Sequence, residues 1–489
     1  MSSLYTAEQV RRIDRNAIER CGITGFALMQ RAAVAAFACL RRRWPQATHI
    51  GLLAGSGNNG GDAFLLGALA LQAGLRVDAI ALTPVSSGDA ARARDAFGVA
   101  GGRILVADAN TEIPEADVIV DGLVGTGLAR PINGVAATLI EKLNTAQRTV
   151  LALDLPSGLD ADTGACLGAT VRADATLSFI AWKRGLFTND AVDRCGALEL
   201  ALLDLPDAAC DGIVADAHVL DDSLSSLLAP RRNNSNKSSF GHVLILGGDH
   251  GMAGAVRLAG EAALRCGAGL VSVATRAAHV IALNAARPEL MARGIENANE
   301  LAVLIERASV IAVGPGMGQD AWGHGLFEAA LGSAKPLVLD ADALNLLAQA
   351  PRVLPAQTVL TPHPGEAARL LGCDVMAIQR DRYAAVRAIA AHYGAIVVLK
   401  GAGSLIGDPQ GRVAVCPWGN PGMASGGMGD LLTGVVAALR AQELSGWDAA
   451  RLAVGVHARA GDVAAGTALR GLIASDLFEP LRERVNRFT

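Results

Sequence analysis

The sequence predicts two α/β domains, each built on a mostly parallel sheet that helices cover on both faces. Hydrophobic residues make up 51% of the 489 residues, so the chain can bury large cores. Aromatic residues are only 4% of the chain, and Ala, Gly, Val and Leu dominate instead, which suits buried parallel strands and closely packed helices. Short apolar runs alternate with helical segments, as in layered α/β folds, and the length suggests two or three domains.

Charge and cysteine usage exclude several classes of protein. The net charge is −4 and is spread along the chain without a basic stripe, so we expect no nucleic-acid partner. We expect no membrane partner, because no apolar run reaches spanning length without a charge or a glycine, and residues 1–20 are polar and helical, unlike a signal peptide. The cysteines include no Cys-x-x-Cys pair, which is typical of a reducing, cytoplasmic protein without structural zinc.

The first unit is expected over residues 1–215 and begins with two helices. We expect helices at 6–20 and 25–43, strands at 49–53 and 76–82 with a helix up to residue 73 between them, and short strands at 118–121, 149–154 and 197–202. The carboxyl ends of parallel strands line the ligand site of an open sheet, so the loops after these strands form the candidate site.

A glycine-rich loop follows the first strand. Its spacing Gly55-x-Gly57-x-x-Gly60 matches the dinucleotide-binding fingerprint, which is weak evidence alone. A nicotinamide cofactor bound in the usual way would need an acidic residue at the end of the next strand, whereas Asp78 lies inside that strand. The segment 58–62, Asn-Asn-Gly-Gly-Asp, instead offers amides and a carboxylate that suit a polar ligand and a monovalent cation.

Two further strand ends carry acidic loops. Asp121 ends one strand and is followed by the glycine-rich loop 122–131. Asp154 ends the next strand, and Ser157 follows it. Each loop alone could be a structural turn, but three such ends can converge at one edge of the sheet.

Together these loops resemble the YjeF N-terminal domain family, the NAD(P)H-hydrate epimerases, which implies a Rossmann-like three-layer sandwich over residues 1–215. The resemblance implies that Asp154 binds the substrate and transfers a proton, because a carboxylate can protonate and deprotonate beside the nicotinamide ring. It also implies that the hydrated nucleotide is held by Asn58, Asn59, Gly60, Gly61 and Asp62, its phosphates by Gly125, Thr126, Gly127, Leu128, Ala129, Arg130 and Pro131, and potassium by Asn59, Asp121 and Ser157.

Lys183 and Ala63 each allow two interpretations. Lys183 matches a family lysine that assists catalysis or binds phosphate, but it could also be a surface lysine. Ala63 stands where the family usually has glycine. A positive φ there would strain an alanine by about 1 kcal/mol, whereas a position in the helix start would favour it, and we favour the helix.

A second unit is expected over residues 225–489, with a polar linker or boundary loop at 229–239. We expect strands at 242–246, 270–274, 310–313, 337–339, 358–360 and 395–399, and helices ending at 266 and spanning 375–391. This alternation predicts a layered α/β sandwich with a parallel sheet.

Polar loops again follow these strands. Gly316 lies in one such loop, and Pro362 and Pro364 stiffen the backbone on both sides of His363. A lone histidine is more often structural, but a stiffened histidine at a strand end favours ligand contact. Lys400 begins a glycine turn that can meet a nucleotide phosphate with charge and backbone donors, although no Walker A sequence is present.

The stretch 420–434 carries the strongest signal in the second unit. Gly426, Gly427 and Gly429 crowd the turn before an apolar helix, so the backbone can take positive φ and approach a ligand closely. The first amides of a helix lack internal partners and stabilise a phosphate or an oxyanion. We expect Asp430 to stay ionised at the helix start and to take a proton from a hydroxyl. The alternative is that it only caps the helix.

Gly-Gly-Met-Gly-Asp at 426–430 resembles the anion-hole and catalytic-base motif of the ribokinase-like superfamily, and the longer stretch 420–430 resembles the ADP/ATP-dependent NAD(P)H-hydrate dehydratases. Met428 replaces the alanine of many relatives, which should be harmless because backbone makes the cradle. The resemblance implies a ribokinase-like α/β sandwich and magnesium, with Asp340, Asp342 or Glu366 as indirect ligands. It assigns the hydrate to Ala255, Gly316, His363 and Asp430, and ADP to Lys400, Gly401, Ala402, Gly403, Ser404 and Gly429.

The two resemblances imply a bifunctional enzyme that repairs hydrated NADH and NADPH. The first half would interconvert the R and S hydrates. The second would phosphorylate the S hydrate with ADP or ATP and then eliminate phosphate, with Asp430 as the base. We expect small-molecule partners and a homo-oligomer. The alternatives are a ribokinase-like small-molecule kinase fused to a nucleotide sensor and, for the first half, a ligand-binding module without turnover.

Overall fold

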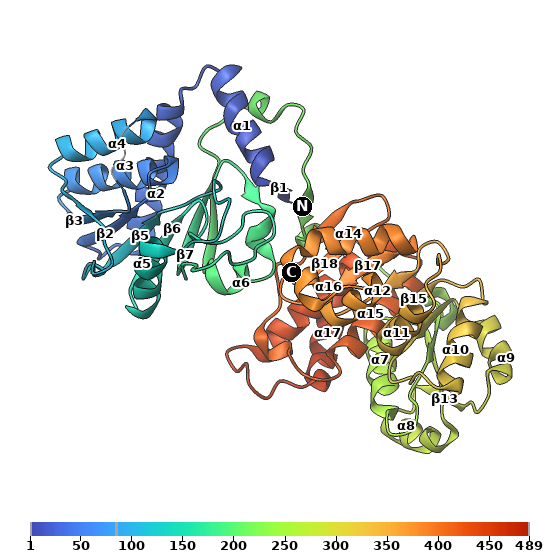
Figure 1. The fold of residues 1–489 in the computed structure, drawn as a ribbon. Coiled ribbons are helices and arrows are strands. Elements are labelled where there is room, and N and C mark those ends of the chain that lie inside the picture. The colour runs from blue at the N-terminus through green and yellow to red at the C-terminus, as the bar shows by residue number, and fades with distance from the viewer. Residues whose placement is uncertain (1, 84–86, 488–489) are drawn as a thin grey trace. The chain divides into compact units, whose positions relative to one another are not determined.

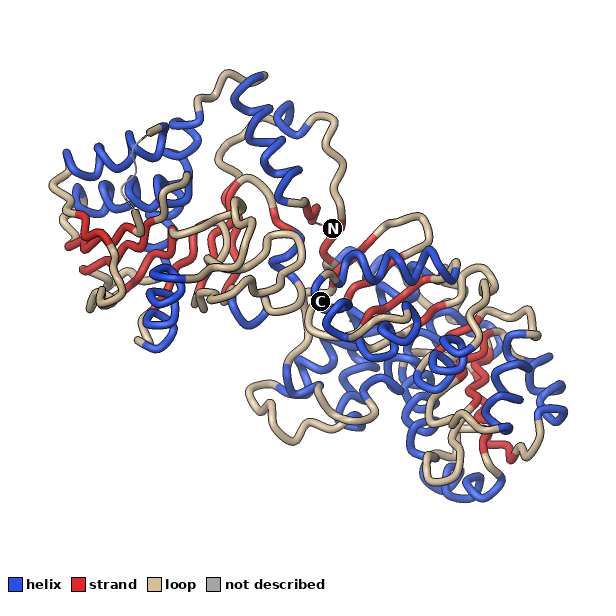
Figure 2. Tube along the Cα trace, in the orientation of Figure 1, coloured by secondary structure: helices blue, strands red, loops and turns tan. Residues whose placement is uncertain are grey.

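The computed structural model describes residues 2–83 and 87–487. Residues 1, 84–86 and 488–489, which fall inside the predicted domains, lie outside this description. The chain divides into two compact units, one from Ser3 to Ala217 and one that begins at His218. Each has strands in its interior and helices around them (Figure 1; Figure 2). Among the described residues, no helix combines the length and apolar character that a membrane span requires.

The first unit contains a parallel sheet with the order β4-β3-β2-β5-β6-β7-β9 over the described residues. Its strands are β2 (His49–Ala54), β3 (Arg76–Ala81), β4 (Ile104–Val106), β5 (Val118–Gly122), β6 (Thr149–Leu153), β7 (Ala175–Phe179) and β9 (Ala197–Ala201). Its helices are α1 (Ala7–Glu19), α2 (Gly25–Arg43), α3 (Asn58–Gln72), α4 (Gly88–Val99), α5 (Gly134–Thr145) and α6 (Ala191–Arg194). In addition, β1 (Ser2–Tyr5) pairs in parallel with β8 (Trp182–Lys183).

The strand order of this sheet reverses between β2 and β5, which pair with each other. In open parallel sheets, ligands bind beyond the carboxyl ends of the strands at such a reversal. One face of the sheet is buried under α2, α3 and α4, and the other is buried under α5 (Figure 1). The predicted Rossmann-like three-layer sandwich is therefore confirmed.

The second unit contains a mixed sheet with the order β13-β12-β11-β14-β15-β16-β17-β18-β19-β10 over the described residues, in which only β18 runs antiparallel to its neighbours. Its strands are β10 (Ala217–Val219), β11 (His242–Leu246), β12 (Leu270–Thr275), β13 (Met291–Gly294), β14 (Val310–Val313), β15 (Leu337–Leu339), β16 (Val359–Leu360), β17 (Ile396–Leu399), β18 (Leu405–Gly407) and β19 (Val413–Val415). Its helices are α7 (Ala253–Arg265), α8 (Val280–Ala286), α9 (Ala302–Arg307), α10 (Ala321–Leu331), α11 (Ala341–Gln349), α12 (Pro364–Leu371), α13 (Val375–Arg380), α14 (Arg382–Tyr393), α15 (Met428–Ala441), α16 (Gly446–Ala465) and α17 (Phe478–Asn486).

Helices bury both faces of this second sheet. Ile245 of β11 belongs to the core under α7, α15 and α16, whereas its neighbour Leu244 points to the other face and is equally buried. Helix α14 covers part of that other face, since a Cβ built on Gly407 of β18 would lie only 2.9 Å from the Val386 side chain of α14. The strand order reverses between β11 and β14, so the loops after β11, β14 and β15 lie at the expected ligand-binding edge.

Most predicted elements match the structure closely, and β11, β14 and β15 match at both ends. The predicted single helix at 375–391 is wrong. Asp381 leaves the helical conformation, and its carboxylate accepts a hydrogen bond from the Ala384 amide (2.9 Å), so one helix ends and α14 begins there. The strands β1, β4, β7, β8, β10, β13, β18 and β19 were not predicted. All of them except β7 have only two to four residues, too few for a periodic pattern to stand out.

Gly434 is predicted to be essential for the packing of α15 on α7. A Cβ at this position would lie 2.0 Å from the Ala259 carbonyl oxygen, a backbone atom that cannot move without shifting α7. We expect Gly434→Ala to lower the free energy of unfolding by about 1–3 kcal/mol, as overpacked cores do, seen as a lower melting temperature in calorimetry. Gly254→Ala is the control, since its added Cβ would meet no atom within 4 Å. Equal melting temperatures for the two variants would contradict this account.

Candidate functional sites

Glycine packing holds the loop between β2 and α3. A Cβ on Gly55 would lie 1.8 Å from the Leu123 carbonyl oxygen, and a Cβ on Gly60 would lie 2.0 Å from the Gly55 carbonyl oxygen. Only glycine permits these approaches, which bring the start of α3 against the loop after β5. Ala63 is fully buried inside α3 and faces Gly122. It therefore continues the helix without positive φ, as the favoured interpretation predicted.

Asp121 and Ser157 form a buried polar pair at the ends of β5 and β6. The Asp121 carboxylate accepts hydrogen bonds from the Ser157 hydroxyl (2.6 Å) and amide (2.8 Å). Burial raises the pKa of Asp121 to about 6, and these hydrogen bonds lower it in part. The loop after β5 connects this pair to Asn59. Its Val124 amide donates to the Ser157 hydroxyl (2.8 Å), and the following residue, Gly125, packs on the Asn59 side chain.

The Asn59 side chain is the unsatisfied member of this group. Its amide oxygen and nitrogen are both buried, and neither has a hydrogen-bond partner within residues 2–83 and 87–487. Buried polar atoms are normally paired with protein, water or an ion. The three residues predicted to coordinate potassium therefore lie on adjoining segments, and one of them has an oxygen free to bind a ligand.

Asp154 follows β6 and has a positive φ of 68°, a conformation that non-glycine residues rarely adopt. Lys183 is only 1% exposed, so its interpretation as a surface lysine is wrong. The Lys183 ammonium donates to one Asp154 oxygen, to the Ser178 hydroxyl (3.1 Å) and to the Phe179 carbonyl (2.8 Å), which uses all of its N–H groups. The other Asp154 oxygen would lie 3.4 Å from a Cβ on Gly125 and thus faces the predicted phosphate loop.

The rest of the first predicted site divides into buried and exposed parts. Asp62 is 8% exposed, and burial raises the pKa of its carboxyl well above the ordinary value, with the Asp154 and Asp14 charges raising it further. The predicted phosphate loop is half-buried at Gly125 and Thr126. Its other end is more open, with Gly127, Ala129, Arg130 and Pro131 exposed and Leu128 half-buried.

Asp340 directly follows β15 and lies at the centre of the second site. It is 1% exposed, and its two oxygens accept hydrogen bonds from the Lys400 ammonium (2.8 Å) and the Thr433 hydroxyl (2.7 Å). Burial alone would lower the pKa of Lys400, but Asp340 and Glu366 outweigh burial and raise that pKa. A Cβ on Gly429 would lie 3.2 Å from the Lys400 nitrogen, so the charged lysine adjoins the start of α15.

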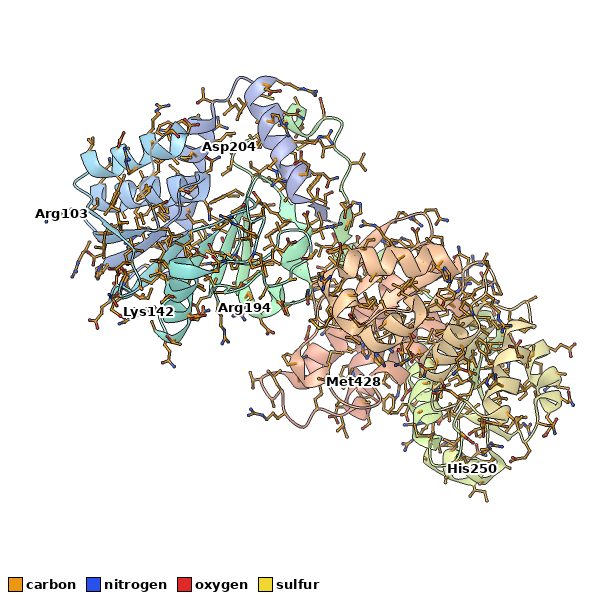
Figure 3. All side chains as sticks on the ribbon, in the orientation of Figure 1. Arg103, Lys142, Arg194, Asp204, His250 and Met428 are labelled. Carbon is orange, nitrogen blue, oxygen red and sulfur yellow. The ribbon has the colours of Figure 1, made fainter. Side chains whose placement is uncertain are left out.

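The turn before α15 has the predicted left-handed glycine. Gly427, with φ 90°, is the N-cap and precedes Met428, the first residue of α15, which is labelled in Figure 3. No described side chain caps this helix start, so its first amides are available to an anion. Asp430 is the third residue of α15 and not its N-cap. The interpretation of Asp430 as only a capping residue is therefore wrong.

The expectation that Asp430 is fully ionised at neutral pH is also wrong. Burial, and then the charge of Asp340, raise the pKa of Asp430 to about 7, although Lys400 lowers it. The expectation considered only the favourable helix dipole, and the loss of solvent outweighs that dipole. A carboxyl with a pKa near 7 can lose and regain a proton at neutral pH, which suits a general base.

His363 is the N-cap of α12, with Pro364 as the first helical residue. Its Nδ1 accepts a hydrogen bond from the Gly365 amide (2.9 Å), and its own amide donates to the Glu366 carboxylate (2.8 Å). The side chain is 50% exposed, and burial followed by the Lys400 charge lowers the pKa of the imidazole. A neutral, partly exposed imidazole is thus fixed beside the lysine.

Gly316 and Ala255, both predicted to bind the hydrate, lie next to each other, whereas Arg382 supports the ADP loop and was not predicted. A Cβ on Gly316 would lie 3.2 Å from the Ala255 side chain, so both line one surface. The loop after β17 begins with Lys400 and Gly401 (φ 132°) and rests on Arg382, which is 1% exposed. The Arg382 guanidinium donates to the carbonyl of Leu399, the last residue of β17, and to that of Lys400 (3.2 Å each). Arg382 follows Arg380 and Asp381 and is the first residue of α14, so no local pattern in the sequence distinguishes it from an exposed arginine.

Two protein families and two solved structures define the class of protein to which this chain belongs. Residues 243–483 match the family described as NAD(P)H-hydrate dehydratase, and residues 25–185 match the YjeF-related protein N-terminus. A ribokinase-like superfamily protein from Enterococcus faecalis is 30% identical, with a TM-score of 0.52 over 56% of this chain and 97% of that one. An ADP/ATP-dependent NAD(P)H-hydrate dehydratase from Bacillus subtilis, co-crystallised with ATP and Mg²⁺, is 28% identical, with a TM-score of 0.50 over 56% of this chain and 99% of that one. The chain is therefore a two-domain α/β enzyme with a ribokinase-like second domain.

Relatives that span both domains define the family. The bifunctional NAD(P)H-hydrate repair enzymes Nnr of Coxiella burnetii and Escherichia coli are 44% and 43% identical to this chain over 99% of its length, and the matches cover 100% and 94% of those proteins. The chain belongs to the family of bifunctional NAD(P)H-hydrate repair enzymes. Its N-terminal domain is the epimerase and its C-terminal domain is the dehydratase, as the sequence predicted.

Asp430 is predicted to destabilise the folded chain at neutral pH. Its pKa is about 7 in the fold against an ordinary value of 3.8, so the folded state binds the proton more tightly and stability falls as the pH rises through this range. We expect Asp430→Asn to raise the melting temperature, and the gain to grow between about pH 4 and about pH 8. Glu306→Gln, which removes an exposed carboxylate from the same unit, is the control. A gain of the same size at both pH values would contradict the raised pKa.

Proposed function

We propose that the chain repairs NADH and NADPH hydrates in two steps. The domain at 1–215 interconverts the R and S hydrates, and the domain at 225–489 dehydrates the S hydrate with ADP, releasing AMP and phosphate. The observation that carries the proposal is the start of α15, where uncapped amides adjoin both Lys400 and Asp430. ATP is the alternative co-substrate, and a homo-oligomer in the cytoplasm stays a prediction.

In the dehydratase domain, Asp430 takes the proton of the C6 hydroxyl, and the oxygen attacks the terminal phosphoryl group of ADP. The amides at the start of α15 stabilise the charge on that group. Phosphate is a better leaving group than hydroxide, and it departs when the ring nitrogen donates its electron pair. Ala255, Gly316 and His363 contact the hydrate, while the residues assigned to ADP are Lys400, Gly401, Ala402, Gly403, Ser404 and Gly429.

The carboxylates near this site suit outer contacts to magnesium better than direct ones. Asp340 is bonded to Lys400 and Thr433, and Asp342 accepts a hydrogen bond from the Gly318 amide (2.9 Å). Across the described residues, no three His, Cys, Asp or Glu side chains gather as a metal site. Magnesium held by the nucleotide's own phosphates would neutralise charge during transfer, with Asp340, Asp342 and Glu366 around it.

In the epimerase domain, Asp154 is the proton-transfer residue and Lys183 fixes its position. The residues for the nucleotide are those at 58–62, and the phosphates lie along 125–131. Potassium fits Asn59, Asp121 and Ser157. The Asn59 oxygen has no hydrogen-bond partner among the described residues and lies beside Gly125. The loop that leads to Gly125 donates hydrogen bonds to the Ser157 hydroxyl and the Asp121 carboxylate. A bound potassium ion would supply positive charge for substrate binding and order the loop.

Two variants separate the activities. We expect Asp430→Asn to lose about 10²–10⁴-fold in dehydration of the S hydrate with ADP, because the base is removed. We expect Asp154→Asn to keep S turnover and to slow use of the R hydrate, after subtraction of spontaneous epimerisation. The measurement is the return of reduced nicotinamide absorbance, first from S and then from the epimeric mixture. If Asp430→Asn dehydrates at the parent rate, or if the product is a stable phosphate ester as from a simple kinase, the proposal is wrong.

Potassium is expected to act on the epimerase domain through Asn59. Replacing K⁺ by choline should slow epimerisation, followed by chromatographic separation of the R and S hydrates. Asn59→Ala should raise the K⁺ concentration for half-maximal rate by about tenfold or more, since a ligand is lost. Asn299→Ala, at an exposed position of the other domain, is the control. A parent enzyme indifferent to K⁺ would contradict the potassium site.

A further inference from the structure

Helix α1 contacts the epimerase site although no sequence motif of the site includes it. The Arg11 guanidinium donates to the Thr126 carbonyl (3.0 Å), which lies in the predicted phosphate loop. Asp14 is three residues further on and therefore on the same side of the helix. Its carboxyl interacts with the charges of both Asp62 and Asp154. The helix thus brings a third carboxyl to the site.

The charges at this site are unbalanced. Asp62 lies three residues after Asn59 on α3 and therefore on the same side of that helix. The Asn59 side chain and one Asp154 oxygen each lie 3.4 Å from the position of a Cβ on Gly125, and Asp154 is paired with Lys183. The carboxyls of Asp14, Asp62 and Asp154 therefore interact with one cation, Lys183. Lys183 gives all of its N–H groups to Asp154, Ser178 and a backbone carbonyl, so none is left for the other two carboxyls. Asp62 is 8% exposed, and it makes no hydrogen bond or ion pair with any described residue. A largely buried carboxyl without a protein partner holds a proton or contacts water or a ligand.

The charged groups that face Asp62 are Asp14 on α1, Asp154 after β6 and Lys183 on β8. Burial is the largest cause of the raised pKa of Asp62, followed by the Asp154 and Asp14 charges, with Lys183 opposing them. Neighbouring carboxyls with different surroundings commonly act as an acid and a base. Here Asp154 is paired with Lys183, whereas Asp62 has no such partner.

We propose that Asp62 is the proton donor of the epimerase and Asp154 the acceptor, and that Asp14 is a positioning residue for Asp62; this rests on the proposed function. Asp62 gives its proton to the C6 hydroxyl, the C6–O bond breaks as the ring nitrogen forms a C=N bond, and water leaves. Water then adds to the opposite face of the ring and loses a proton to Asp154. That proton returns from Asp154 to Asp62, which resets the site.

The test is the pH profile of R-to-S conversion by the full-length chain, followed by chromatographic separation of the epimers with the spontaneous rate subtracted. Asp14→Asn removes a charge that raises the pKa of Asp62, so the alkaline limb should move to lower pH by about one unit. The rate on the acid side should stay within about twofold of the parent, because the proton donor is intact there. Asp14→Glu should restore the parent profile. Glu19→Gln, which removes an exposed charge from the same helix, should leave it unchanged.

The outcomes distinguish this inference from the proposed function. If the parent chain does not convert R to S, the proposed function of the domain fails. If the parent does so but Asp14→Asn keeps the parent alkaline limb, or loses rate equally at every pH, Asp14 has no positioning role. Asp62→Asn should lose at least about 10²-fold in rate while folding normally, and parent-like turnover by that variant would overturn Asp62 as the donor.

Discussion

An aspartate–lysine ion pair with little exposure to solvent follows a strand end and organises each site: Asp154 with Lys183 in the first domain, and Asp340 with Lys400 in the second. Burying two charges is unfavourable unless the geometry is good and their other hydrogen-bonding groups are satisfied. Lys183 meets this condition with three acceptors, and Asp340 meets it with the additional Thr433 hydroxyl. Each pair therefore fixes the strand end and the loop that follows it.

Beside each pair lies a second carboxyl without a lysine of its own. Burial and the charge of the paired aspartate raise the pKa of Asp62 in one domain and of Asp430 in the other. The same arrangement thus occurs on two sheets of different topology. The second carboxyl lowers the stability of the fold at neutral pH, because it ionises more easily in the unfolded chain. Such unfavourable groups concentrate at functional sites, where a proton must be held and released.

The sequence predicted what depends on local signals, namely the fold class, the strand ends and the glycine cradle at Gly427. It failed where the outcome depends on segments far apart in the chain. The raised pKa of Asp430 comes from burial and Asp340, which the helix-start pattern does not contain. Arg382 and Asp14 support the sites from helices without a recognisable motif, so only the folded structure brings them to those sites.

The most direct test of the account is a crystal structure of this chain with ADP and a reduced nicotinamide nucleotide. The account predicts a terminal phosphate oxygen within about 3 Å of the first amides of α15, with the Asp430 carboxyl directed at the nicotinamide ring. A nucleotide bound away from that helix start, or an Asp430 side chain turned away from both ligands, would contradict it.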